Sequence, residues 1–327
     1  MVYVIDLNGG GDFSSVQAAV DHAAPGDTLI VRPGIYRERV VVHRDGLRVS
    51  GEDGAILTGS GCAKDTWPGG QEKGTFFSAT LLVLGRDVSV ENLTVRNDAG
   101  DGRVVGQAVA VYAAGDRGVW RNCRFIAHQD TLFCGPVMPR LLDEIAPRLN
   151  PGAECVPSVG NSPLTRSRQY FENCFIQGDV DFIFGPYRCW FEGCTLFMNA
   201  RGGWYTAANT PQDQPWGMVF HNCRLTGECE PGEAKLGRPW RAFARTLFLA
   251  CDMDACVSPR GFEDWDNWDG VREVTERCGE WRTTGVRADL SQRHPRQKCL
   301  TDDEAAGITP QEVLGGEWYK ALQSSTV

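Results

Sequence analysis

The sequence predicts an all-β fold: a parallel β-helix, or solenoid, with short capping helices at both ends. Three observations favour this fold. A short apolar motif recurs six times, most copies stand 20 to 30 residues apart, and the same region lacks long helical periodicity. In each copy an apolar residue stands three positions before a Cys or Leu, and another stands two positions after it. These central residues are Leu93, Cys123, Cys174, Cys194, Cys223 and Cys251.

The first expected element is a short helix near the N-terminus. Residues 13–24 have helical spacing, and Asp12 or Ser14 is a plausible N-cap. Solenoids need their open ends covered, and an amphipathic helix at this position could cover the first coil.

The coils of the solenoid follow this helix. The steps between the central residues are 30, 51, 20, 29 and 28 residues long, as expected if each step is one coil. The central cysteines would then stack in a column inside the coils. Because the sequence contains no CxxC pair, we expect these cysteines to be small buried hydrophobes and not metal ligands.

The longest step contains an irregular stretch rich in Pro, Gly and Ser at about 134–165. Removing these 32 residues shortens that step from 51 to 19 residues. We therefore expect an inserted loop at about 134–165 within one domain that spans residues 1–327. The last expected element is a helix over residues 309–322, because Thr309-Pro310 is a typical helix start.

Charge and hydropathy exclude several classes of function. A formal net charge of −9 disfavours nucleic acid, which favours a basic surface. No stretch approaches the run of about 18 apolar residues that a membrane helix needs. No signal peptide is visible, so we expect a cytoplasmic protein, or a secreted one whose leader lies outside this sequence. We also expect a monomer.

Two aspartates stand at matched positions. Asp130 follows Cys123 by seven residues, and Asp181 follows Cys174 by seven. If the inserted loop bulges outward, both side chains lie at the same point on successive coils, about 4.8 Å apart. Two carboxylates that close repel, so one should hold a proton at neutral pH. Arg201 has the same offset from Cys194 and could neutralise the pair, contact an acidic sugar or simply lie on the surface.

The strings around these aspartates resemble the signature blocks of the pectin methylesterase (pectinesterase) family. The main blocks are QDTLF at 129–133, VDFIFG at 180–185 and LGRPW at 236–240. Smaller ones are GIYRE at 34–38, SAT at 78–80 and GQAVA at 106–110. The blocks run in family order from about residue 3 to 320, and the resemblance implies a right-handed parallel β-helix.

The resemblance also implies catalytic roles in the hydrolysis of methyl esters of (oligo- or poly)galacturonate, with release of methanol. Asp181 would be the nucleophile, and Asp130 would be first the general acid and then the base. Gln107 and Gln129 would donate hydrogen bonds to the oxyanion. Arg238 would hold Asp181 ionised and oriented.

Methylated pectin or an oligogalacturonide is the implied substrate partner, and no cofactor or metal is expected. The expected substrate-binding residues are Trp240, Phe133, Phe184, Thr80 and Val180. Trp265 and Trp268 could lie on a loop beside the cleft, or could equally pack that loop onto the coils.

The sequence departs from the family at two places beside the expected site. The link between the two aspartate blocks is enlarged by the stretch at 134–165, which could narrow or lengthen a sugar groove. His128 occupies a position where the family often has Tyr, but the proposed chemistry needs no histidine.

Rival functions remain open to different degrees. A polygalacturonase should show NTD, GHG and RIK strings, and none occurs. A pectate lyase would need an acidic calcium cluster, for which Asp264, Asp266 and Asp269 lack the family context. The absence of a GxSxG string argues against a serine esterase, and the intact catalytic residues argue against an inactive binding protein. An esterase or thioesterase for another acyl group stays possible.

Overall fold

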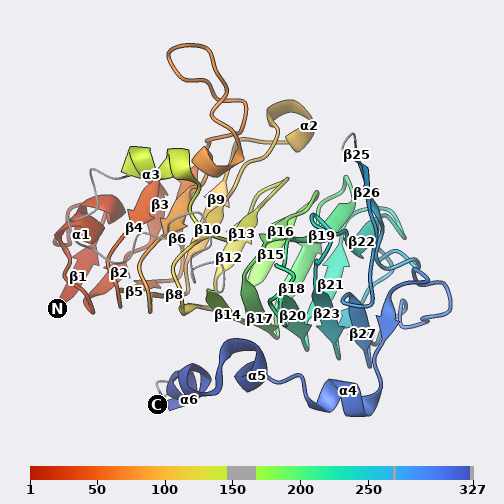
Figure 1. The fold of residues 1–327 in the computed structure, drawn as a ribbon. Coiled ribbons are helices and arrows are strands. Elements are labelled where there is room, and N and C mark those ends of the chain that lie inside the picture. Colours follow the sequence, from red (N-terminus) through yellow and green to blue (C-terminus); the bar gives the residue numbers. More distant parts are fainter. Residues whose placement is uncertain (146–166, 268–269, 325–327) are drawn as a thin grey trace.

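The computed structural model describes residues 1–145, 167–267 and 270–324. Within these residues three long sheets of eleven, seven and eight strands run side by side, and neighbouring strands in them are parallel (Figure 1). Between residues 28 and 253, successive described strands belong to the eleven-, eight- and seven-stranded sheets in turn, so each complete coil in this range contributes one strand to each sheet. This arrangement is a parallel β-helix, and the fold predicted from the repeat is confirmed.

The strands and helices have the following bounds. The eleven-stranded sheet contains β1 (Val2–Ile5), β2 (Thr28–Val31), β5 (Arg48–Gly51), β8 (Ser89–Glu91), β11 (Gly118–Arg121), β14 (Arg168–Glu172), β17 (Arg188–Glu192), β20 (Met218–His221), β23 (Thr246–Leu249), β27 (Gly279–Trp281) and β28 (Lys298–Cys299). The seven-stranded sheet contains β4 (Val40–Val42), β7 (Leu81–Val83), β10 (Val111–Ala113), β13 (Leu132–Cys134), β16 (Ile183–Gly185), β19 (Gly203–Ala208) and β22 (Ala234–Gly237). The eight-stranded sheet contains β3 (Gly34–Arg37), β6 (Ala55–Gly59), β9 (Thr94–Asn97), β12 (Arg124–Ile126), β15 (Phe175–Gly178), β18 (Thr195–Met198), β21 (Arg224–Gly227) and β24 (Asp252–Met253). An antiparallel pair joins β25 (Trp265–Asn267) to β26 (Gly270–Arg272), and the helices are α1 (Val16–His22), the short 3₁₀ helix η1 (Thr75–Phe77), α2 (Gly102–Val105), α3 (Pro139–Ile145), α4 (Asp302–Ala306), α5 (Pro310–Leu314) and α6 (Gly316–Ser324).

Asparagines make the sharp turn from the eleven-stranded to the eight-stranded sheet. The residue before the central Leu or Cys has a positive φ in successive coils, which is the left-handed conformation that Asn tolerates better than most residues. These residues are Asn92 (φ 55°), Asn122 (52°), Asn173 (53°) and Asn222 (52°). The Asn122 side chain also donates to the Asn92 side-chain oxygen at 3.2 Å. The recurring asparagine of the sequence motif is therefore explained by backbone geometry.

The interior of the coils is filled by stacked side chains. The five central cysteines are at most 1% exposed, as predicted for small buried hydrophobes. Beside them runs a ladder of aromatic rings whose centroids are 4.4 to 5.9 Å apart and whose planes lie within 13° of each other. Its members are Trp120, Phe171, Phe191, Phe220 and Phe248. Burial of this much apolar surface is the main source of stability that repeated coils can provide.

Helix α1 covers the N-terminal coils, as expected. Val16, Ala19 and Val20 of α1 belong to the interior core. The N-cap is Ser15, not the Asp12 or Ser14 predicted from the sequence. The carboxylate of Glu38 accepts hydrogen bonds from the Val16 amide at 2.7 Å and from the Ser15 hydroxyl at 2.8 Å. The GIYRE block at 34–38 thus has a structural role, because Glu38 anchors the capping helix.

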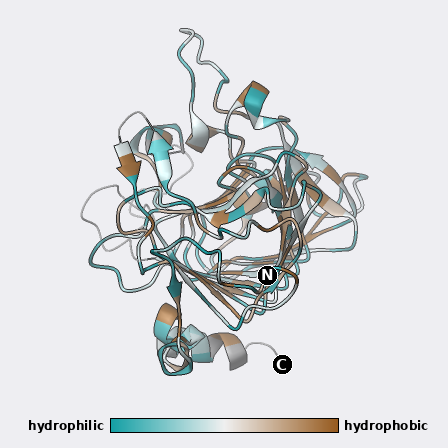
Figure 2. Cartoon of the chain, turned by 90° about the vertical axis from the view of Figure 1, so that its right-hand side faces the viewer, coloured by the Kyte–Doolittle hydropathy of each residue, from teal (hydrophilic) through white to brown (hydrophobic). Residues whose placement is uncertain are grey.

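The C-terminal helices are placed differently from the prediction. The helix expected over 309–322 is divided into α5 and α6 at Gly315, which has a φ of 89°. Both lie along the outer face of the eleven-stranded sheet instead of over the last coil, and they run back beneath the molecule (Figures 1 and 2). Val313 and Leu314 pack there against Trp190 and Val219, so this pair of helices covers an apolar sheet face and does not cap an end.

The outer face of the seven-stranded sheet carries a second apolar row. Leu82, Tyr112, Phe133 and Phe184 occupy one register position on successive coils. Together with Val137 and Leu141 they form an apolar cluster outside the coils.

Part of the predicted insertion belongs to this outer cluster. Helix α3 lies in the described part of the stretch at 134–165, and residues 146–165 of that stretch lie outside the described residues. No helix in the described part of the chain is long and apolar enough to span a membrane.

Candidate active site

Asp130 and Asp181 lie side by side on successive coils. Leu132 and Ile183 are paired in register, and each aspartate stands two residues before its strand. The Asp130 amide donates to the Val180 carbonyl oxygen at 3.0 Å, which fixes the spacing of the two coils at this point. Asp130 is 8% exposed and Asp181 is 6% exposed. The matched offsets in the sequence therefore correspond to adjacent, almost fully buried carboxyl groups.

Both aspartates have a left-handed backbone. The φ angle is 66° at Asp130 and 51° at Asp181. Residues other than glycine seldom adopt this conformation, and it tends to occur where the surrounding structure holds a functional side chain in place. Here it turns each chain abruptly at the start of β13 and β16.

Burial and neighbouring charges affect the pKa values of the two carboxyl groups differently. Burial raises the pKa of Asp130 well above its usual value, and the neighbouring charge of Asp181 raises it further. Burial also raises the pKa of Asp181, but the hydrogen bonds from Arg238 act in the opposite direction. These surroundings therefore favour the negative charge on Asp181 and the proton on Asp130.

Arg238 makes a two-pronged contact with Asp181. Its Nε donates to Asp181 Oδ1 at 2.9 Å and its Nη2 donates to Oδ2 at 2.7 Å. The Arg238 side chain is 16% exposed, so this ion pair is largely shielded from water. Such fork-to-fork geometry both stabilises the carboxylate and sets its orientation.

The side-chain amides of Gln107 and Gln129 lie on neighbouring coils. The Ala108 backbone amide donates to the Gln129 backbone carbonyl oxygen at 3.1 Å. Because Ala108 directly follows Gln107, this bond holds the backbones of the two glutamines close together. Both glutamines are half-buried. Neither amide forms a hydrogen bond with another described residue, so their N–H donors remain free for a ligand.

His128 and Asp179 form a second pair beside the aspartates. His128 Nδ1 and Asp179 Oδ2 are 3.0 Å apart, and this hydrogen bond raises the pKa of His128. Asp179 has no exposed surface. Arg201, which could have neutralised Asp130 and Asp181, instead lies 3.8 Å from Asp179 and 3.9 Å from Asp101. Sequence reasoning did not single out Asp179, although it and His128 each stand five residues after a central cysteine.

The aromatic residues predicted to bind substrate divide into two groups. Phe133 is 0% exposed and Phe184 is 4% exposed, so neither ring presents a face to a ligand. Phe133 packs against Tyr112, Phe184 and Phe76 at centroid distances of 4.7, 4.7 and 4.9 Å. Trp240 is half-buried and meets Phe184 edge to face at 6.0 Å. The two phenylalanines thus support the floor of the site, and Trp240 has a ring surface available at it.

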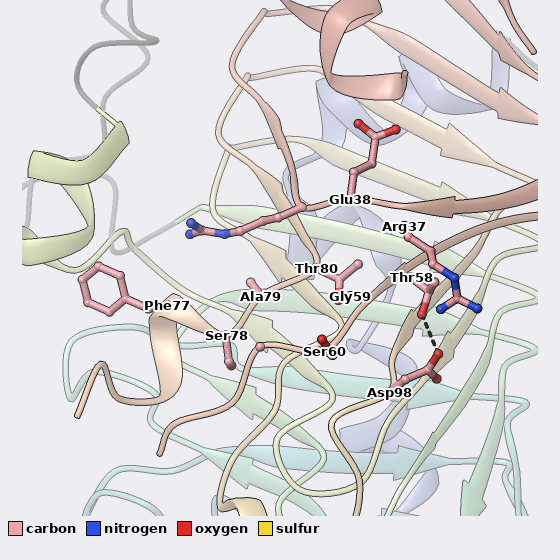
Figure 3. Close-up of a pocket in the computed structure, with 12 residues that line it drawn as sticks. Arg37, Glu38, Thr58, Gly59, Ser60, Phe77, Ser78, Ala79, Thr80 and Asp98 are labelled. Carbon is pink, nitrogen blue, oxygen red and sulfur yellow. Dashed lines mark hydrogen bonds between the residues drawn. The ribbon is translucent and has the colours of Figure 1, made fainter. Parts of the chain in front are cut away.

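Thr80 and Val180 occupy different parts of the same face. Val180, 5% exposed, stands between Asp179 and Asp181. Thr80 lines a cavity of about 310 Å³ together with Glu38, Ser60 and Ala79 (Figure 3). By strand register Ala79 stands in the aspartate column, two coils before Asp130. The Thr80 hydroxyl donates to the Arg96 carbonyl oxygen at 3.0 Å, and the residue is 1% exposed.

Two tryptophans contact Arg238. The guanidinium carbon of Arg238 lies over the ring of Trp265, whose role the sequence left open, and also over the ring of Trp204. No periodicity or motif pointed to Trp204, because only the register of β19 with β16 brings it here. Trp268 lies outside the described residues.

The acidic cluster considered for calcium is used differently. The Asp264 carboxylate accepts the Val274 amide at 2.7 Å and lies 3.2 Å from His294 Nε2. Asp269 is outside the described residues. Among the described residues, no group of three or more His, Cys, Asp or Glu side chains is placed to hold a metal ion.

Comparison with known proteins gives a consistent result. The sequence model of the family described as Pectinesterase matches residues 2–136 and 164–317. Pectinesterase 31 of Arabidopsis thaliana is 31% identical over 314 residues, covering 92% of this chain and 88% of that protein. Putative pectinesterase 14 of the same plant is 33% identical, covering 97% of this chain and 87% of that protein.

Solved structures agree with these matches. The pectin methylesterase from carrot superposes with a TM-score of 0.78 at 26% identity, covering 98% of this chain and 95% of that one. A crystal structure of pectin methylesterase in complex with a hexasaccharide gives a TM-score of 0.78 at 25% identity, covering 96% of each chain.

Proposed function

Because the chain belongs to the pectinesterase family and is therefore a hydrolase that acts on pectin esters, we propose that it removes methyl groups from methylated galacturonate by means of Asp181 and Asp130. The substrate would be methylated pectin or a shorter methylated oligogalacturonide, and the products would be methanol and a free uronate carboxyl. The proposal gives the two aspartates separate roles.

The first step forms an acyl-enzyme. An oxygen of the Asp181 carboxylate attacks the C6 carbonyl carbon of the ester, and the carbonyl oxygen becomes an oxyanion. The free N–H donors of Gln107 and Gln129 would hydrogen-bond this oxyanion, and one such donor can lower a barrier by about 3 kcal/mol. When the tetrahedral intermediate collapses, Asp130 transfers its proton to the departing methoxide, and methanol leaves.

The second step regenerates the enzyme. Asp130, now ionised, removes a proton from water, and the water oxygen attacks the galacturonyl carbon of the anhydride. The bond to Asp181 breaks, so that Asp181 becomes a carboxylate again, Asp130 has regained its proton, and the sugar carries the new carboxyl group. Arg238 would stabilise Asp181 whenever it is charged.

One observation carries this proposal: two adjacent buried carboxyl groups have unequal partners. Asp181 receives both prongs of Arg238, at 2.7 and 2.9 Å, and among the described residues no cation makes such a contact with Asp130. A charged nucleophile beside a protonated acid is the combination that ester cleavage requires.

The test is methanol release from highly methylated pectin and from short methylated oligogalacturonides. Asp181→Asn and Asp130→Asn should each reduce the rate by about a thousand-fold or more. Asp87→Asn is a matched control, since Asp87 also has a left-handed backbone, with φ 57°, but lies on another turn and pairs with Arg117. Folded wild type that releases no methanol from either substrate would contradict the proposal.

A further inference from the structure

The guanidinium of Arg238 packs against two tryptophan rings. Its central carbon is 3.8 Å from the ring centroid of Trp204 and 3.9 Å from that of Trp265. Both rings are half-buried. We call Trp204 and Trp265 the tryptophan clamp.

The two sides of the clamp come from distant parts of the chain. Trp204 lies in β19, and the pairing of Ile183 with Thr206 places it next to Asp181 in the aspartate column. Trp265 begins β25. Glu263, two residues before Trp265, accepts a hydrogen bond from Trp204 Nε1 at 3.0 Å. A single segment, 263–265, therefore supplies one ring and fixes the other.

The geometry leaves Arg238 few ways to move. A guanidinium is planar, with its N–H donors in the plane and weakly hydrated faces above and below. The two rings of the clamp lie against the guanidinium carbon, so they limit its movement while Nε and Nη2 donate to Asp181. Cation–π attraction to each ring adds to this hold, and does so more strongly where water is excluded. Because the two half-buried rings replace water beside the guanidinium, the ion pair with Asp181 lies in a less polar medium and is correspondingly stronger.

We propose that Trp204 and Trp265 are positioning residues for the reaction: by clamping Arg238 they hold the Asp181 carboxylate in the charged, correctly oriented form that attacks the ester. This inference rests on the proposed role of Asp181 as nucleophile. Neither ring needs to touch the sugar for this effect. The clamp therefore acts on the turnover step more than on substrate affinity.

Other charged groups face this centre and belong in the account. Lys235 Nζ lies 5.8 Å from the Trp204 centroid, and the Arg272 guanidinium carbon lies 5.4 Å from that of Trp265. Three acidic groups lie on the elements around this centre: Asp130, which adjoins Asp181 in the column, Asp179, whose charge also acts on Asp130, and Glu263, which is bound to Trp204. None of these five groups is changed in the test below, so a shift in the pH profile reports on the stacking itself.

The experiment compares Trp204→Leu and Trp265→Leu with Trp204→Phe and Trp265→Phe. Methanol release is measured against substrate concentration and pH. In each Leu variant we expect kcat to fall about ten-fold with little change in KM. We also expect the acidic limb of kcat/KM to move up by about 0.5 to 1 pH unit, since one pKa unit equals about 1.4 kcal/mol. The Phe variants keep a stacking face and should retain most of the wild-type profile.

Trp240→Leu is the comparison variant, because Trp240 belongs to the same site but packs on Phe184. It should raise KM and leave the acidic limb in place. If a Leu variant does not fold, the Phe variant of the same residue provides the test. Its acidic limb of kcat/KM should move in the same direction as expected for the Leu variant, but by less. Folded Leu variants with unchanged kcat and an unmoved limb, or with an effect in KM alone, would overturn the clamp while leaving the proposed function intact. Wild type without methanol release, or an active Asp181→Asn variant, would overturn both.

Discussion

At the residue scale, the proposed reaction centre is a locally unfavourable arrangement held by its surroundings. Asp130 and Asp181 combine a left-handed backbone with nearly complete burial. Each feature costs stability, and a carboxylate without a cation beside it costs most when it is ionised. The side chain of Asp130 should therefore show the conflict between stability and catalysis most clearly.

Asp130→Asn should make the protein more stable at neutral and alkaline pH. The pKa of Asp130 is raised in the folded state, so its contribution to stability is fully present below its unfolded pKa, near 3.9, and is lost as pH rises through the folded pKa. Asparagine cannot ionise and tolerates positive φ. In urea unfolding, the gain should be on the order of 1 kcal/mol at pH 8 and smaller near pH 4. A variant less stable than wild type at pH 8 would contradict this reading.

The rate of ester hydrolysis should depend on pH as a bell. In the proposed mechanism activity requires ionised Asp181, so kcat/KM should fall as pH drops through the Asp181 pKa, which burial raises and the hydrogen bonds from Arg238 lower. It also needs protonated Asp130, so kcat/KM should fall again as pH rises through the pKa of Asp130, which is raised well above its ordinary value. The apparent pKa values of the two limbs belong to the coupled pair of aspartates and not to either residue alone. If the rate instead keeps increasing with pH, Asp130 does not act as a general acid.

At the element scale, the turn between two sheets sets the repeat. The position before the central Cys requires positive φ in every coil from Asn92 to Ala250. Asparagine meets this requirement in four of these coils, and glycine meets it at Gly193. Ala250, with φ 52°, is the position where the residue type fits the backbone least well.

Ala250→Gly should stabilise the protein, although glycine usually destabilises. Replacing alanine in a left-handed turn removes a strain of about 1 kcal/mol, which exceeds the entropy that glycine loses on folding. Ala113→Gly is the matched control, because Ala113 lies within β10 and has no positive φ. There we expect a loss of about 0.5 to 1 kcal/mol. Urea unfolding of the two variants should give shifts of opposite sign, and shifts of equal sign would argue against turn strain.

At the scale of the whole molecule, the solenoid must end, and a buried ion pair fastens its last coils. Glu280 of β27 is 0% exposed, and the Arg293 side chain that pairs with it is 3% exposed. Arg293 Nε donates to Glu280 at 2.6 Å, and its Nη1 and Nη2 donate to the carbonyl oxygens of Pro259 at 2.8 Å and Arg287 at 2.6 Å. One side chain thus ties β27 to a loop that precedes it in the chain, at Pro259, and to one that follows it, at Arg287.

Glu280→Gln should destabilise the protein by about 3 to 5 kcal/mol, because the Arg293 charge would stay buried without its partner. Arg293→Met should have a similar effect. The double variant should lose clearly less than the sum of the two single losses, since no unpaired charge remains. A complete thermodynamic cycle by urea unfolding measures this coupling, and strictly additive losses would show that the pair does not act as a unit.

Local patterns in the sequence were enough to predict the coils and the alignment of Asp130 with Asp181. The motif spacing gave the parallel β-helix, because each coil repeats the same short turn and the same buried column. The equal offsets of Asp130 and Asp181 gave their alignment, because register between neighbouring coils carries an offset directly from one to the next. Arg238, Gln107 and Gln129 were recognised only by resemblance to a family.

The tertiary structure alone decided where segments return from a distance. The sequence predicted a helix over residues 309–322. It could not show that this helix is divided at Gly315, or that it covers a sheet face instead of the end of the solenoid. Phe133 was predicted to bind the substrate, yet its ring is buried because Tyr112 and Phe76 pack over it. Trp204 and Trp265 meet on Arg238 through the register of one coil and the path of a later segment. Periodicity describes each coil by itself, whereas contacts of this kind depend on where the chain comes back.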